Sequence, residues 1–71
     1  MIRKPTAAEL GAFIRRHRLA RGMTQDELGS HVGLLKHAVC RIERGHVCPS
    51  AAAWVSLVNV LDAPQFVIAD A

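Results

Sequence analysis

The stretch that decides the fold is 24–45, TQDELGSHVGLLKHAVCRIERG. Thr24 is a favourable N-cap residue, and Glu27 three residues later completes a capping box. Apolar residues then follow four positions apart, which places them on one face of a helix. Gly33 stands where a helix commonly ends in a left-handed residue. The pattern predicts a short helix that starts at Thr24 and stops at Gly33.

A second helical period begins near Leu35. Val39 and Ile42 share one face of this segment, and Gly45 closes it. Gly29 in the preceding helix costs about 1 kcal/mol of helix propensity relative to alanine. That cost is tolerable where another helix must pass close by. Two short helices that cross over a small residue and are linked by a glycine turn predict a helix-turn-helix.

The outer face of the second predicted helix is rich in hydrogen-bond donors. It lies away from the apolar face, and the one acid of this helix, Glu43, lies elsewhere on the helical wheel. Such a face suits base edges and phosphates in a DNA major groove, whereas the alternative is a helical hairpin with no ligand. The residues of the outer face are Lys36, His37, Cys40, Arg41 and Arg44.

The charge is unevenly distributed along the 71 residues, which are few enough to predict a single domain. All nine lysine and arginine residues lie in 1–45, together with four of the six acidic residues. The remainder holds only Asp62 and Asp70. A basic body with a mildly acidic tail suits a polyanionic partner on one side, although a charge excess can also be a solubilising surface.

Two cysteines, Cys40 and Cys48, are too few for a disulfide framework. With the four histidines they form no spacing typical of a zinc site, so we expect no metal and no cofactor. We also expect a reduced cytoplasmic protein, because no apolar run reaches membrane-spanning length and no signal peptide is visible. No catalytic constellation is present, which predicts that the protein is not an enzyme.

The segments before and after the central stretch are also predicted to be helical. Thr6 and Glu9 have the spacing of a capping box at the start of a helix that runs to about Ala20. We expect Leu10 and Ile14 to form its inner face, with Phe13 and His17 flanking it. A last helix begins after Ser50, and its apolar residues at helical spacing are Trp54, Leu57, Val58 and Leu61.

Residues 65–69, QFVIA, follow a break at Pro64 and are β-branched or aromatic, which favours a strand. A single strand leaves unpaired donors and acceptors, so we expect it to pair with the same strand of a second chain. Its contacts in the dimer are predicted to come from Phe66, Val67, Ile68 and Trp54. The alternative is a short fifth helix that starts at Pro64.

Several of these motifs occur together. They are L-G-x-x-I-R-x-x-R from Leu10, G-x-T-Q-x-x-L from Gly22, R-I-E-R-G from Arg41 and P-S at Pro49. In this combination the chain resembles the lambda-repressor-like, or Xre, DNA-binding domains over roughly residues 6–61. The resemblance implies an all-α bundle of four or five helices that binds double-stranded operator DNA as a homodimer.

The resemblance also implies roles for individual residues. Arg18 and Glu43 match an ion pair that ties the first helix to the third, and Gln25 matches a contact to phosphate. The positions that reach bases are Lys36, His37 and Arg41. We further predict that phosphates are contacted by Arg44, His46, Arg3 and Lys4.

The chain departs from the family pattern at several positions. Leu35 stands where the family often has a serine or threonine N-cap, so the recognition helix lacks a side-chain cap. Ala38 and Cys40 replace common hydroxyl residues, and Gly29 replaces the usual alanine. Because base-contacting positions are affected, the operator sequence is not predictable.

The tail, VNVLDAPQFVIADA, resembles the end of HipB-type antitoxins, in which a short strand pairs with its copy in the partner subunit. This likeness implies an antitoxin that represses its own operon and also binds a kinase-like toxin of the HipA type. Two alternatives are a stand-alone, phage-like regulator and a protein-interaction module that has lost DNA binding.

Overall fold

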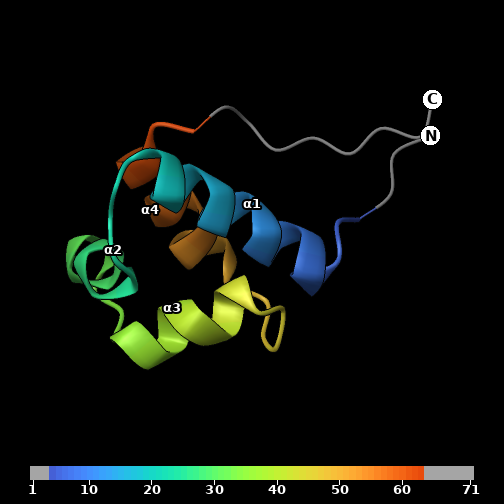
Figure 1. Ribbon diagram of the computed structural model, residues 1–71. Helices are drawn as coiled ribbons and strands as arrows, with labels where there is room; N and C mark the ends of the chain where they lie inside the picture. Colours follow the sequence, from blue (N-terminus) through green and yellow to red (C-terminus); the bar gives the residue numbers. More distant parts are fainter. Residues whose placement is uncertain (1–3, 64–71) are drawn as a thin grey trace.

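The computed structural model describes residues 4–63, which form four helices (Figure 1). They are α1 (Ala7–Ala20), α2 (Gln25–Val32), α3 (Lys36–Glu43) and α4 (Ala51–Leu61). The all-α fold is therefore confirmed for this part of the chain. The predicted strand at 65–69, its alternative as a fifth helix, and Arg3 all lie outside the described residues. None of the described helices is long and apolar enough to cross a membrane.

The helices pack as a small bundle in which α1 contacts both α3 and α4. α2 also packs against α3 and α4, so α1 and α2 each contact both α3 and α4. Figure 1 shows α2 and α3 joined by a short turn, with α3 along one edge of the molecule. This position leaves one side of α3 without a covering helix among residues 4–63.

Hydroxyl side chains cap three of the four helices at the predicted positions. The side chains of Thr6 and Thr24 accept hydrogen bonds from the backbone of the third helical residue, at 3.1 and 3.0 Å. Ser50 does the same for α4 at 3.1 Å. α3 differs because its N-cap residue, Leu35, makes no side-chain cap bond. The predicted helix starts are confirmed, including the missing cap.

The turn between α2 and α3 depends on two glycines. Gly33 ends α2 with a left-handed backbone, φ 74°, which glycine adopts without steric cost. The backbone N–H of Leu34 then donates to the carbonyl of Gly29 at 2.9 Å. A Cβ on Gly29 would meet the carbonyl oxygen of Leu34. The nearest neighbour of such a Cβ would thus be the turn after α2, whereas the side chain of Val39 in α3 would lie at ordinary contact distance from it.

The core is built from apolar side chains of all four helices, and it differs from the prediction in α1. Leu10 is only half-buried, whereas Phe13 is buried beside Ile14. Phe13, predicted only to flank that face, belongs to the core because α1 packs against two helices, which widens its buried stripe on the Phe13 side. The buried apolar residues are Phe13, Ile14, Leu28, Val39, Ile42, Leu57 and Leu61.

Candidate nucleic-acid interface

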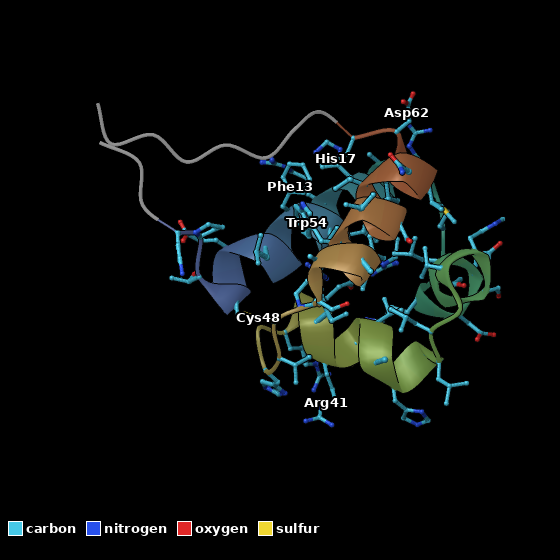
Figure 2. All side chains as sticks on the ribbon, turned by 180° about the vertical axis from the view of Figure 1, so that it is seen from behind. Phe13, His17, Arg41, Cys48, Trp54 and Asp62 are labelled. Carbon is cyan, nitrogen blue, oxygen red and sulfur yellow. The ribbon has the colours of Figure 1, made fainter. Side chains whose placement is uncertain are left out.

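The outward side of α3 carries exposed cationic and donor side chains. Val39 and Ile42 are buried and hold the opposite side of α3 against the core. In Figure 2, Arg41 points away from the body of the protein. The exposed residues of this outward side, called the α3 face below, are Lys36, His37, Arg41 and Arg44.

Cys40 lies at the edge of the α3 face rather than on it. Its side chain is half-buried, as is that of Ala38, so neither residue is fully presented to solvent. Cys48 is exposed in the following loop, and both thiols are free. Within residues 4–63, no three histidine, cysteine or acidic side chains are grouped to hold a metal ion.

The predicted ion pair between Arg18 and Glu43 is present and buried, with each residue 7% exposed. Arg18 Nε donates to Glu43 Oε2 at 2.6 Å, and Nη2 donates to Oε1 at 3.0 Å. Arg18 Nη1 donates to the carbonyl of Met23 at 2.7 Å. The hydrogen bonds to Glu43 raise the pKa of Arg18 above its usual value, against the opposing effect of burial. The pair therefore fixes α3 to α1 and to the turn that follows α1.

Gln25 joins this network, which the sequence did not indicate. Its side-chain Nε2 donates to Glu43 Oε1 at 3.1 Å, and the residue is half-buried at the start of α2. The side-chain amide of Gln25 has two N–H donors. One of them is used inside the protein, and the other can donate to a ligand. Glu43 consequently positions Gln25 as well as α3. Sequence spacing alone carries no signal for this bond, because the two residues are 18 positions apart.

The start of α2 is held by a reciprocal capping box. The backbone N–H of Thr24 donates to Glu27 Oε1 at 2.8 Å. That backbone hydrogen bond is the main reason why the pKa of Glu27 lies below its usual value. A carboxyl group whose pKa is lowered by folding stabilises the folded state at pH values above its unfolded pKa. This contribution is lost as the pH falls through its folded pKa. The capping box therefore holds the α2 start in place at neutral pH.

The remaining predicted phosphate-contacting residues lie just after α3 or near the start of the chain. Arg44 is exposed at the C-cap, and His46 is exposed in the loop, where its backbone N–H donates to the carbonyl of Arg41 at 2.9 Å. Lys4 is exposed before α1, and Arg3 lies outside the described residues. Lys4, Arg44 and His46 are thus exposed, and their contacts to phosphate stay predictions.

Trp54, the predicted dimer contact in α4, packs within its own chain on α1. Its ring centroid lies 5.7 Å from that of Phe13, which in turn lies 4.5 Å from the ring of His17. Figure 2 shows these three side chains close together and well separated from Arg41. Trp54 remains half-buried. The aromatic cluster and the α3 face therefore lie in different parts of the molecule.

The four-helix order, the glycine turn and the outward α3 face define a lambda-repressor-like helix-turn-helix DNA-binding domain of the Xre type. The chain belongs to the family described as "Helix-turn-helix domain", whose sequence pattern it matches over residues 9–70. No curated protein sequence matches the chain.

Solved structures of regulators share this fold. The clp gene regulator ClgR from Corynebacterium glutamicum is 29% identical, with a TM-score of 0.77 over 86% of this chain. PlcR from Bacillus thuringiensis, in complex with the peptide PapR7 and DNA, is 33% identical, with a TM-score of 0.74 over 80% of this chain. The matches cover 66% of the ClgR chain and 20% of the PlcR chain.

HipB, to which the tail was compared, has the same fold. In the HipB-O4 20mer complex the match covers 100% of both chains, with a TM-score of 0.75 and 14% sequence identity. At that identity the similarity concerns the fold alone.

Proposed function

We propose that this protein is a transcriptional repressor that binds a palindromic operator as a homodimer, with α3 in the major groove. The observation that carries the proposal is the α3 face, where Lys36, His37 and Arg41 are exposed while Val39 and Ile42 anchor the helix from behind. A major groove is wide enough to admit one α-helix, and its base edges present acceptors to cationic donors.

Base reading is assigned to Arg41 and Lys36, with His37 assisting. Arginine is the best bidentate partner for guanine, and lysine reaches the same acceptors. The phosphate contacts fix the register of the domain on the duplex without reading sequence. They are assigned to Gln25, Arg44, His46, Arg3 and Lys4.

The homodimer is supported by the composition of α4. Its eleven residues include no charged side chain, and Val55 is 54% exposed while Trp54 is half-buried. An uncharged outer surface of this kind suits a protein contact. Pairing of 65–69 with the same segment of a second chain, through Phe66, Val67 and Ile68, would close the dimer. Two α3 helices about 34 Å apart then read two half-sites of a palindrome.

The biological setting that we favour is the antitoxin of a HipA/HipB-like pair, which represses its own operon in the cytoplasm and binds a kinase-like toxin. The tail motif, which resembles the end of HipB-type antitoxins, supports it. A stand-alone, phage-like regulator is the second candidate. A large kinase-like reading frame beside the gene would separate the two.

Arg41→Ala is expected to weaken operator binding by about 1–3 kcal/mol and to relax the preference at one base pair. The expected loss arises because a truncated side chain leaves the guanine acceptors without their partner. Binding to the operator and to random duplex is measured by electrophoretic shift. Arg15→Ala is the matched control, because it removes the same charge from an exposed site on α1. Equal weakening of operator and random DNA by Arg41→Ala would contradict the base-reading role.

Deletion of residues 65–71 is expected to abolish the dimer and, with it, tight operator binding. Each monomer would bind a half-site independently, so the affinity gained by linking two recognition helices would be lost. Sedimentation gives the oligomeric state, and an electrophoretic shift with the palindrome gives the affinity. Deletion of 70–71 alone keeps the proposed strand and is expected to behave like the full chain. A 65–71 deletion that remains dimeric and binds undiminished refutes the strand as the dimer contact.

A further inference from the structure

Leu35 is the most exposed of the large apolar side chains among residues 4–63. It is 77% exposed, compared with 54% for Val55 and 52% for Leu19. It also directly precedes Lys36 and His37, the first two residues of the α3 face. An isolated exposed leucine needs no explanation by itself, but this one directly adjoins in the chain a surface of cationic and hydrogen-bond-donating side chains.

The backbone of Leu35 is fixed relative to the α3 face. Its carbonyl accepts hydrogen bonds from the backbone N–H groups of Ala38 at 2.9 Å and Val39 at 3.2 Å. Leu35 is the N-cap residue of α3, with an extended backbone, φ −77° and ψ 156°. The first turn of α3 and Leu35 therefore move as one unit, and a DNA groove that receives Lys36 also lies next to Leu35.

The identity of the residue at this position is unfavourable for the isolated domain. Threonine or serine caps α1, α2 and α4 with a side-chain hydrogen bond, whereas leucine offers none to α3. Position 35 thus forgoes a cap and holds a large apolar side chain in water. Both disadvantages are offset if the side chain becomes buried when a ligand binds.

We propose that Leu35 determines specificity by packing against the 5-methyl group of a thymine in each operator half-site. The thymine methyl is the apolar group that base pairs present in the major groove, and an aliphatic side chain is its natural contact. Leucine has no donor or acceptor, so it disfavours base edges whose polar groups it would desolvate without a partner. The inference rests on the proposed function, since it deepens the role of the same surface.

The test begins with an operator selected from random duplex DNA by the full chain. Each thymine is then replaced, one at a time, by deoxyuridine, which removes only the 5-methyl group. We expect about a fourfold loss of affinity at one thymine position in each half-site, as for the burial of one methyl-sized group. With both half-sites replaced, the expected loss is about sixteenfold.

Variants of the protein assign this loss to Leu35. Leu35→Ala is expected to bind the thymine and deoxyuridine operators equally well, at an unchanged melting temperature. Leu19→Ala is the matched control, since it truncates another exposed leucine on α1 and should keep the full thymine preference. Leu35→Ser should lose the thymine preference while the melting temperature rises by about 4–8 °C, because serine restores a cap to α3.

Two outcomes would overturn the inference, and they differ from failure of the proposed function. If the wild-type protein binds its operator but tolerates deoxyuridine at every thymine, no methyl group is read. If Leu35→Ala keeps the wild-type thymine preference, another residue reads the methyl group and the assignment to Leu35 is wrong. If no sequence is selected at all, the proposed DNA-binding function itself fails, and this inference fails with it.

Discussion

Glu43→Ala is expected to reduce the free energy of unfolding by about 3–5 kcal/mol, because it leaves the guanidinium of Arg18 buried without its partner. Arg18 and Glu43 are each 7% exposed, so the guanidinium left behind is poorly hydrated and has lost its counter-charge. The same substitution also removes the acceptor of Gln25. Three helices thereby lose a shared anchor in one step.

Thermal and urea unfolding followed by circular dichroism measure this effect. For a domain of this size the expected decrease in Tm is more than about 12 °C. Arg21→Ala is the control, since it removes the exposed pair with Asp62, in which the charged atoms lie 3.7 Å apart. An exposed pair contributes about 0–1 kcal/mol, so its loss should hardly change the Tm. Similar losses for both variants would show that the buried pair contributes no more than a surface pair.

Gly11→Ala is expected to destabilise the protein by about 1–3 kcal/mol or more, although alanine is the better helix former. A Cβ at this position would meet the carbonyl oxygen of Ile42 and would lie 2.7 Å from that of Glu43. Both are backbone atoms at the end of α3, so no side chain can rotate away. The only relief is a displacement of α3 from α1, which would also strain the Arg18–Glu43 pair.

Chemical unfolding of Gly11→Ala and of the neighbouring variant Ala12→Gly separates sterics from propensity. Ala12 is exposed, so Ala12→Gly should lose only the propensity difference of about 1 kcal/mol. We expect Gly11→Ala to lose more than Ala12→Gly, although the substitution runs in the favourable direction for helix formation. A Gly11→Ala protein as stable as the wild type would refute the close backbone contact.

The helix boundaries were predictable from the sequence because they depend on local chemistry. A hydroxyl at the N-cap bonds to a backbone N–H only three residues away, which is why Thr6, Thr24 and Ser50 marked their helices. Gly33 ended α2 through its own backbone conformation. The missing cap at Leu35 was equally local. The donor-rich outer side of α3 followed from helical spacing.

The Arg18–Glu43 pair was only partly predictable from the sequence. Its residues are 25 positions apart, so periodicity would have assigned both to the surface, and it was the family resemblance that joined them. Its burial and its two hydrogen bonds come from the structure. The burial explains why removal of one partner is expected to have a large effect.

Other features were decided only by the tertiary structure, because they require the position of one helix relative to another. The hydrogen bond from Gln25 to Glu43 gives Gln25 a structural role, whereas the family resemblance implies only a phosphate contact. Phe13, predicted at the flank of the inner face of α1, is fully in the core because α1 packs on two helices. Gly11 gave no local signal, since its small size matters only where the backbone of α3 crosses it. The sequence by itself therefore determined where each helix begins and ends, whereas the crossing of α1 and α3 decided which residues hold the α3 face in place.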